Sequence, residues 1–397
     1  MTTEKDPIVI VGAARTPMGG LLGELAPLQA WELGAAAIRA ALERAQLSPE
    51  DVDETIMGCV LPAGQGQAPA RQASKAAGIP DKTGAVTVNK MCGSGMKTVM
   101  IGHDSILAGT NRIVVAGGME SMTNAPYLLP KARAGYRLGH AEVKDHMFLD
   151  GLEDAYDRGK LMGVFAENTA RHYQFTREQQ DAYAIESLKR ARKASEDGSF
   201  ATEIVPVTVK TRKGEMEIAV DEQPRKAKPE KIPQLKPAFA KDGTVTAANA
   251  SSISDGAAAL ILMRRSEAEK RGLPVLAEIR AHATHSQAPE WFTTAPVGAI
   301  RKVLEKAGWD KDDVDLYEIN EAFAVVTMAA MKELGLPHEK VNIYGGACAL
   351  GHPIGASGAR IIVTLLNALQ RTGGRRGVAS LCIGGGEATA VAVELAA

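Results

Sequence analysis

Several features are scarce in this sequence, and each shortage argues against a class of protein. Aromatic residues make up only 4% of the 397 residues, which disfavours a surface that stacks nucleic-acid bases. The formal charge is −1 and both signs are interleaved, so no basic face predicts binding to nucleic acid or to a membrane. No apolar run approaches the roughly 20 residues that span a bilayer, and the first residues lack a signal-peptide pattern. We therefore expect a soluble cytoplasmic protein.

Cysteine is also scarce, and its four positions have no metal-ligand spacing: Cys59, Cys92, Cys348 and Cys382. Such sparse usage fits a reducing compartment better than a disulfide scaffold. Cys59 and Cys348 are expected to be small core residues. His282 and His285 could form a metal pair, but they lie in an expected strand without a third ligand, so we reject that interpretation. His103 is expected to be a satisfied histidine of a buried helix, and no metal site is predicted.

An internal duplication is the strongest architectural signal. The segment Ala37–Ala45 recurs as Ala299–Ala307, and Asp51-Val-Asp recurs as Asp313-Val-Asp at the same offset. In each copy amphipathic helices alternate with short apolar strands, which predicts an α/β fold. A period this long is incompatible with a solenoid. The sequence therefore predicts two homologous halves, the first opening with a strand over Ile8–Val11 and a turn from Gly12.

The second copy joins its last two strands, 378–381 and 389–393, by a short connection, whereas a long segment separates their counterparts, 113–116 and 257–262. That segment predicts an insertion containing a helix over Arg177–Ala194, which a Thr176-x-x-Gln179 capping box opens. Its Lys- and Pro-rich later part, 221–237, is expected to be irregular and exposed. The predicted units are the N-terminal half at 1–120, the insertion at 121–249, return strands at 250–275 and the C-terminal half at 276–397.

Cys92 is the leading candidate for a nucleophile. It follows the apolar run Ala85–Val88, expected to be a buried strand, and precedes a helical pattern that ends at Gly109. At such a junction the free N–H groups and the helix dipole favour a thiolate. Gly93 and Gly95 would let a substrate approach the backbone closely. A small buried hydrophobe is the alternative for an average cysteine, but this position favours a nucleophile.

Three more polar groups are expected at strand ends. Asn320 follows a strand over Leu316–Ile319, although asparagine is also a favoured N-cap residue. His352 lies in a glycine-rich loop before a helix, and Cys382 ends a strand beside Gly384. Because both halves contribute such groups, they indicate one composite site between the halves.

Four motifs carry a resemblance to a known family. They are Asn89-Lys-x-Cys-Gly-Ser-Gly, Asn320-Glu-Ala-Phe, Gly351-His-Pro-Ile-Gly-Ala-Ser-Gly and Cys382-Ile-Gly-Gly-Gly. Together they resemble the thiolase family, and within it the acetyl-CoA acetyltransferases (acetoacetyl-CoA thiolases), from Ile8 to the C-terminus. The resemblance implies the thiolase fold: two βαβαβαββ halves stacked as a five-layer αβαβα sandwich, with an inserted loop domain.

The resemblance also implies roles for the candidate residues. Cys92 would take the acyl group from a CoA thioester, and His352 would be the base that activates its thiol. Cys382 would remove or return the α-proton of acetyl-CoA. Asn320 would hold a water that completes one oxyanion hole with His352, and the Cys92 and Gly384 amides would form a second. Each role needs the residue type present: a thiol that attacks and leaves, a base of tunable pKa, and preset donors.

Contacts to CoA are implied for three residues: Arg225, Ser251 and Met162. Coenzyme A thioesters are then substrates, no separate cofactor is expected, and the resemblance implies a homotetramer built from two dimers. Leu161 stands where many short-chain members have a histidine. The segment Pro289-Glu-Trp-Phe-Thr-Thr replaces a Met/Gly-rich stretch near the acyl pocket. We favour the interpretation that its adjacent rings, Trp291 and Phe292, plug the pocket over one that leaves them on the surface.

The predicted activity is the reversible condensation of two acetyl-CoA to acetoacetyl-CoA and CoA, or thiolysis of short-chain 3-ketoacyl-CoA. A decarboxylating or HMG-CoA-type condensing enzyme on the same fold is an alternative, and Cys382 counts against it. A thiolase-like lipid or acyl-CoA binding protein is a second alternative, and the presence of all four catalytic positions counts against that. Physiological direction and acyl chain length are not determined by the sequence.

Overall fold

A computed structural model describes residues 6–212 and 214–396. The first half has the predicted order βαβαβαββ, once its two-residue strand β2 (Gly19–Gly20) is set aside. Its elements are β1 (Ile8–Arg15), α1 (Ala30–Arg44), β3 (Glu54–Gly58), α2 (Pro69–Ala76), β4 (Gly84–Val88), α3 (Ser94–Leu107), β5 (Ile113–Ser121) and β10 (Ser254–Arg264).

The second half repeats this order after the short helix α7 (Arg265–Arg271), with one strand reduced. Its elements are β11 (Ala277–Ser286), α8 (Ala295–Ala307), β12 (Leu316–Ile319), α9 (Ala324–Leu334), α10 (Ala347–Leu350), α11 (Ile354–Thr372), β13 (Arg376–Ile383) and β14 (Glu387–Leu395). In place of a counterpart to β4 there is only an isolated bridge between Tyr317 and Val341. The next residue, Asn342, takes over the ladder with its side chain: its Oδ1 accepts from the Ile319 N–H at 2.8 Å, and its Nδ2 donates to the Ile319 carbonyl at 2.7 Å. The full βαβαβαββ pattern therefore holds for the first half only.

The strand order confirms the duplication. Hydrogen-bonded neighbours run β12-β13-β14-β11-β1-β10-β5-β3-β4. The run β3-β5-β10-β1 in the first half matches β12-β13-β14-β11 in the second, with the first pair parallel and the last two antiparallel in each. The two runs meet only where Val9 pairs with Glu278 and Ile10 with Ala277. Each half thus has its own sheet, joined at one short seam.

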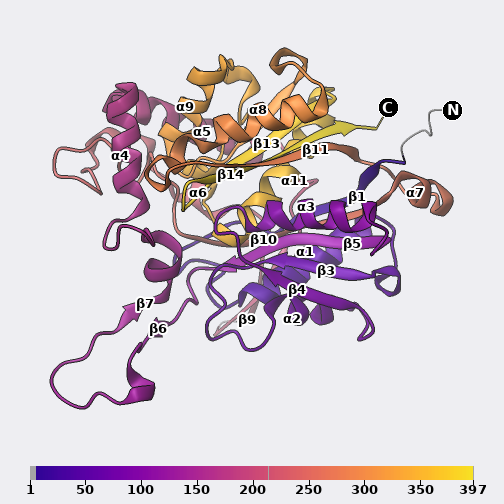
Figure 1. The fold of residues 1–397 in the computed structure, drawn as a ribbon, viewed down its shortest axis with the longest axis horizontal. Helices are drawn as coiled ribbons and strands as arrows, with labels where there is room; N and C mark the ends of the chain where they lie inside the picture. Colours follow the sequence, from indigo (N-terminus) through magenta and orange to yellow (C-terminus); the bar gives the residue numbers. More distant parts are fainter. Residues whose placement is uncertain (1–5, 213, 397) are drawn as a thin grey trace.

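Helices complete a five-layer sandwich (Figure 1). Helices α1 and α2 pack on the outer side of the first sheet, and α8 and α9 pack on the outer side of the second. Helices α3 and α11 lie between the sheets, within a core cluster to which both halves contribute. This αβαβα arrangement is the predicted one. None of the described helices is long and apolar enough to cross a membrane.

The two central helices cross where both have glycine. A Cβ at Gly358 of α11 would lie 2.3 Å from the Met96 nitrogen, and a Cβ at Gly95 of α3 would lie 2.8 Å from the Ala359 nitrogen. Real Cβ atoms do not approach other atoms so closely, so only glycine lets the first turns meet. This crossing brings the N-termini of α3 and α11 to one point between the halves.

Most of the insertion between β5 and β10 lies at the side of the sandwich (Figure 1), but its hairpin at 207–218 packs on the outer core of the first half. Its capping box at Thr176 and Gln179 is confirmed. A hairpin arm with β6 and β7 projects from the molecule, and helices α4 and α5 stand beside the second half. The elements are β6 (Tyr127–Leu128), β7 (Lys144–Asp145), η3 (Phe148–Leu152), α4 (Met162–Tyr173), α5 (Arg177–Glu196), β8 (Val207–Thr211), β9 (Gly214–Ile218), α6 (Glu222–Lys226) and η4 (Pro229–Gln234).

Three local predictions were wrong. The turn predicted from Gly12 is strand, because β1 continues to Arg15, whose buried guanidinium forms ion pairs with Glu203 and Asp221 of the insertion. Strand β4 is not buried, because it is the edge strand of its sheet, with Val86 41% exposed. The segment 221–237 is not irregular throughout, since it forms α6 and η4.

Candidate active site

Cys92 lies at the predicted strand-to-helix junction. The turn before α3 is tight: Met91 has φ +48°, and the Ser94 hydroxyl accepts from the Lys90 N–H at 2.8 Å and donates to the Met91 carbonyl at 2.6 Å. A left-handed residue other than glycine costs free energy and persists where its surroundings fix it. Gly93 is required because a Cβ there would lie 2.3 Å from the Ile383 side chain. The turn therefore places the Cys92 thiol against the end of β13.

The resting Cys92 is a thiol. Its pKa is raised to about 11, chiefly by burial and to a smaller extent by the carboxyl group of Glu120. Hydrogen bonds to the sulfur from the backbone N–H groups of Gly384 and of Cys92 itself lower the pKa, but they do not offset burial. The expectation of a helix-stabilised thiolate was therefore wrong. A nucleophilic role requires a base that removes the proton as the reaction begins.

Cys382 lies beside Cys92, near the end of β13. It is fully buried among aromatic side chains that include Phe165, Phe292 and Phe323. Burial raises the pKa of its thiol well above the usual range, and the neighbouring Cys92 raises it further. The structure thus brings two thiols from the two halves together in an apolar setting.

The glycine-rich turn after β13 forms one wall of this site. Gly385 has φ +94° and Gly386 has φ +87°, and a Cβ at Gly386 would lie 2.3 Å from the Gln287 carbonyl oxygen. A Cβ on Gly384 would lie 3.3 Å from the Met162 sulfur, so Met162, at the start of α4, faces the same turn. The turn presents the Gly384 N–H to the Cys92 sulfur.

His352 is held as a neutral imidazole with one nitrogen free. Its pKa is lowered to about 3, first by burial and then by Arg360. Its Nδ1 lies 2.6 Å from the Ser357 hydroxyl, which also donates to the Pro353 carbonyl at 3.0 Å. The Ser357 hydroxyl uses its one proton in the bond to the Pro353 carbonyl, so it accepts the hydrogen bond from the Nδ1–H of His352. The buried Nε2 has no partner among the described residues and is left as a proton acceptor.

Asn320 faces His352 and does not cap a helix. Its Nδ2 lies 3.5 Å from His352 Nδ1, and its Oδ1 accepts weakly from Arg360 at 3.4 Å. Helix α9 begins at Ala324 with Phe323 as its N-cap, so the N-cap alternative for Asn320 was wrong. The backbone of Asn320 donates to the Ser380 carbonyl at 3.0 Å, which fixes it beside β13.

The four predicted residues therefore converge. Cys92 contacts the Gly384 amide and lies beside Cys382, while Asn320 is within reach of His352. Ile354, two residues after His352, packs in the same small hydrophobic cluster as Cys92. Two thiols, an imidazole and an amide thus meet between the halves, at the ends of strands or the starts of the two central helices.

Two supporting residues were not found from the sequence. Ser357 lies in the same glycine-rich motif as His352, but its bond to His352 depends on the fold of the loop. Glu120, near the end of β5, accepts from the N–H groups of Val60, Leu61 and Gly355 at 2.9–3.1 Å. Burial raises its pKa to about 7. The sequence feature that could have pointed to Glu120 is an acidic residue in the otherwise apolar strand β5.

A cavity of about 330 Å³ lies next to the site, between α5, the α6–η4 segment and α10. Its lining includes Ser252, Cys348 and three lysines, Lys226, Lys228 and Lys231. The Ser252 carbonyl accepts from the His352 N–H at 3.1 Å, so the cavity adjoins the His352 loop. Cys348 is half-buried in the cavity wall, which corrects its assignment as a core residue, whereas Cys59 is buried as predicted.

None of the three residues predicted to bind CoA, Arg225, Ser251 and Met162, is among those that line this cavity. Arg225 is 46% exposed and forms an ion pair with Glu24 at 2.6 Å. Ser251 donates its backbone N–H to the Ala322 carbonyl. The nearby lysines, in the segment predicted to be irregular and exposed, contribute positive charge to the cavity wall.

Replacing Ser357 by alanine should lower kcat about 10- to 100-fold with little change in KM. Without the hydroxyl, the Asn320 amide competes to donate to His352 Nδ1, which favours the tautomer protonated at Nε2. The rate of Cys92 alkylation by iodoacetamide should fall in parallel. Ser195→Ala is a matched control, because Ser195 makes the same kind of bond to a helix carbonyl, far from the site. Unchanged alkylation in Ser357→Ala would contradict the assigned tautomer.

Comparisons with known proteins agree with the fold and the motifs. The sequence matches the thiolase N-terminal domain over residues 8–266 and the thiolase C-terminal domain over residues 273–395. Acetyl-CoA acetyltransferase 1 of Arabidopsis thaliana is 53% identical, covering 98% of this chain and 94% of its own. The cytosolic acetyl-CoA acetyltransferase of Mus musculus is 50% identical over 99% of this chain and 100% of its own.

A solved structure gives the same result in three dimensions. The crystal structure of the Bacillus anthracis acetyl-CoA acetyltransferase superposes with a TM-score of 0.96 at 43% identity, covering 98% of this chain and 99% of that one. The two family domains span nearly the whole sequence, and the relatives named above are about 50% identical over nearly their full length. Both findings indicate the same family. The chain belongs to the thiolase family.

Proposed function

We propose that this protein is an acetyl-CoA acetyltransferase, which reversibly condenses two acetyl-CoA to acetoacetyl-CoA and CoA through an acyl-cysteine. The observation that carries the proposal is the meeting of two thiols, Cys92 and Cys382, close to the loop of His352, whose buried Nε2 has no partner among the described residues. Acyl transfer needs one nucleophile, and carbon–carbon bond formation needs a second, separate base. The names of the Arabidopsis and mouse relatives support the same reaction.

In the first half-reaction, His352 Nε2 accepts the Cys92 proton as the sulfur attacks the thioester carbonyl. The carbonyl oxygen gains the negative charge, and the backbone N–H groups of Cys92 and Gly384 are placed to donate to it. Collapse of the tetrahedral intermediate breaks the carbon–sulfur bond to CoA. The imidazolium returns its proton to the leaving CoA thiolate, which leaves an acetyl group on Cys92.

In the second half-reaction, a second acetyl-CoA enters, Cys382 gives its thiol proton to His352 Nε2, and the resulting thiolate removes a proton from the methyl carbon of acetyl-CoA. The resulting enolate oxygen is stabilised by His352 and by a water held on Asn320. The carbanion attacks the acetyl group on Cys92, and the Cys92 sulfur leaves as the new carbon–carbon bond forms. The imidazolium later returns its proton to the departing Cys92 sulfur. No separate cofactor takes part in this scheme, since the CoA thioesters are the substrates.

The direct test is thiolysis of acetoacetyl-CoA. Protein is incubated with acetoacetyl-CoA and free CoA, and acetyl-CoA is followed by chromatography. Two acetyl-CoA should form for each acetoacetyl-CoA consumed, and none should form with Cys92→Ala. Binding of acetoacetyl-CoA without turnover would instead support an acyl-CoA binding protein.

CoA is proposed to lie in the lysine-lined cavity, with Ser251 and Met162 near its pantetheine arm and Arg225 near its nucleotide. Lys228 lines the cavity, whereas Arg225 points to Glu24. Lys228→Ala should therefore raise KM for CoA several-fold, with kcat nearly unchanged. Arg225→Ala should raise it too if Arg225 exchanges Glu24 for a phosphate on binding. Initial rates measured over a range of CoA concentrations give KM and kcat for each variant. An unchanged KM in both variants would place CoA elsewhere.

The acyl pocket is proposed to accept short chains, because Phe292 packs into the cluster around Cys382. Phe292 is 2% exposed and meets Phe165 edge-on, with centroids 6.5 Å apart. Trp291 is turned away, against His172 at 5.2 Å. Only one of the two predicted plugging rings therefore faces the site.

The specificity constant for thiolysis should fall at least about tenfold from four-carbon to eight-carbon 3-ketoacyl-CoA, because each excluded methylene forfeits about 0.8 kcal/mol of burial and adds overlap. Phe292→Ala should reduce that ratio by opening the pocket. Trp291→Ala is the matched control and should leave the ratio unchanged. Equal constants for four and eight carbons in the unaltered protein would refute the short-chain assignment.

The assembly is proposed to be a homotetramer made of two dimers, in the cytoplasm. The exposed edge strand β4 offers unpaired backbone groups, and the projecting β6–β7 arm carries exposed apolar side chains, including Leu129, Leu138 and Val143. The mouse relative named as cytosolic supports the location. Sedimentation velocity that shows a stable monomer would remove the assembly proposal.

A further inference from the structure

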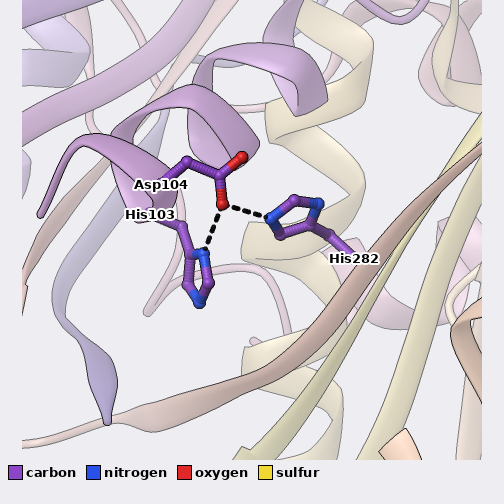
Figure 2. A group of neighbouring side chains, drawn as sticks. All are labelled: His103, Asp104 and His282. Carbon is purple, nitrogen blue, oxygen red and sulfur yellow. Dashed lines mark hydrogen bonds and ion pairs between the residues drawn. The ribbon is translucent and has the colours of Figure 1, made fainter. Parts of the chain in front are cut away.

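Three polar side chains meet between the two halves, away from the active site (Figure 2). His103 and Asp104 come from α3, in the first half, and His282 comes from β11, in the second. The Asp104 carboxylate lies between the two rings, which are nearly perpendicular with centroids 4.9 Å apart. Two imidazoles and a carboxylate from separate elements thus converge on one point.

The distances are short. Asp104 Oδ1 lies 3.0 Å from His103 Nδ1 and 2.8 Å from His282 Nε2. One ligand atom from each of the three residues lies within 4.8 Å of the other two. Two ligands on a tetrahedral zinc ion are roughly 3.3 Å apart, given Zn–N bonds of about 2.05 Å. The two pairs that involve Asp104 are already near this spacing. Rotation of the imidazole rings would bring the ligand nitrogens of His103 and His282 to the same spacing.

The surroundings suit a site that metal can enter. The histidine side chains are 13% and 17% exposed, whereas the Asp104 side chain is 59% exposed, so the rings are fixed and one side is open. Lys306 approaches only the backbone, where its ammonium donates to the His282 carbonyl at 3.1 Å.

This contact changes the earlier interpretation of the histidines. His103 is half-buried and bonded to Asp104, so it is not a core histidine. His285 was the partner considered for His282, but it bonds Gln287 and packs on Gly298 of α8, on the other face of β11. The third ligand that seemed to be missing comes from α3, in the other half.

We propose that His103, Asp104 and His282 form a binding site for a divalent transition-metal ion, zinc in particular, that links the two halves. Two histidines and one carboxylate supply three ligands, and water at the open side completes the tetrahedron. On binding, each imidazole shifts its proton to the nitrogen facing away from the ion and stays neutral. The ion replaces the two hydrogen bonds to Asp104 with three coordinate bonds.

The role of this site is structural. His103 follows Cys92 by three turns of α3, which is roughly 16 Å along the helix axis at about 1.5 Å per residue. An ion at that distance cannot contact the reacting atoms. It would instead fix the far end of the helix that begins at the nucleophile against the second sheet, so that zinc stabilises the folded protein by mass action.

The test is zinc binding by the full-length protein after treatment with a chelator. Two thiols and an imidazole in the active site could also bind zinc. The parent protein and every variant tested for zinc binding therefore carry Cys92→Ser. Calorimetric titration with zinc chloride should give one equivalent in this background, and Tm should rise by at least about 2 °C at saturation. Cobalt(II) in place of zinc should give visible bands without a thiolate charge-transfer band.

Asp104→Asn, at an exposed position, and His282→Gln should each weaken zinc binding on the order of 100-fold and abolish the rise in Tm. His140→Gln, which removes an exposed histidine from the insertion, is the control and should bind as the parent does. Zinc binding that survives both Asp104→Asn and His282→Gln would overturn the proposal, as would a cobalt spectrum with thiolate bands alone. Absence of any binding at millimolar zinc would show that the three residues form only hydrogen bonds.

Discussion

Cys92→Ala should lower kcat for thiolysis by at least about four orders of magnitude, while the protein keeps its fold. Cys92 is the partly accessible thiol that lies beside Cys382 and the Gly384 N–H. Cys382 is fully buried, and the other partly accessible thiol, Cys348, lies in the cavity wall. Losing the nucleophile removes the covalent path, and binding alone does not replace it. Steady-state rates and a circular dichroism spectrum check both parts.

The covalent intermediate can be located directly. Brief exposure to acetyl-CoA followed by digestion and mass spectrometry should place an acetyl group on the peptide that contains Cys92. The label should persist in Cys348→Ser, which controls for acylation of the other half-buried cysteine. An acetyl group found only on the Cys382 or Cys348 peptide would reassign the nucleophile.

The positions of the site residues could be predicted because each depends on local pattern. An apolar run followed by glycines and a helical repeat placed Cys92, and the duplication indicated that Asn320, His352 and Cys382 would meet it. Strand ends from two similar halves lie at equivalent places, so proximity follows from topology. The resemblance to thiolases then supplied their roles, which remain predictions.

The protonation state of Cys92 could not be predicted, because it depends on burial. A helix N-terminus favours the thiolate, but the desolvation of Cys92 raises its pKa to about 11, and nothing in the local sequence reveals how much protein covers the sulfur. The same limit applies to β4, which has the composition of a buried strand but lies at the sheet edge. Its position depends on which strands pair, not on its own residues.

Contacts between the halves were also beyond the sequence. The bond of Ser357 to His352 depends on the path of one loop, and that of His282 to Asp104 depends on how α3 crosses the second sheet. In the second half, the Asn342 side chain bonds the Ile319 backbone where the family resemblance implied a further strand. In each case a side chain contacts a residue that is distant in the chain. A single sequence contains no local pattern that predicts such a contact.

Cys382→Ala should abolish carbon–carbon bond formation while the acetyl-enzyme still forms. The Cys382 thiol touches the same site as Cys92, but it lies in an apolar cluster and its pKa is raised well above the usual range, so it is a poor competitor for the acyl group. As a thiolate formed in the active site, it would be a strong enough base to remove the α-proton of bound acetyl-CoA.

Two rates measured on one variant separate these roles. Exchange of labelled CoA into acetyl-CoA reports acylation of Cys92 and should stay within about tenfold of the unaltered protein. Condensation, followed as acetoacetyl-CoA formation, should fall by at least about three orders of magnitude. Cys382→Ser is the informative companion, because it keeps the shape but its hydroxyl is a much weaker acid than a thiol, so it should behave like the alanine variant. Condensation near the unaltered rate in either variant would exclude Cys382 as the base, and equal loss of both rates would mean that Cys382 acts in acyl transfer as well.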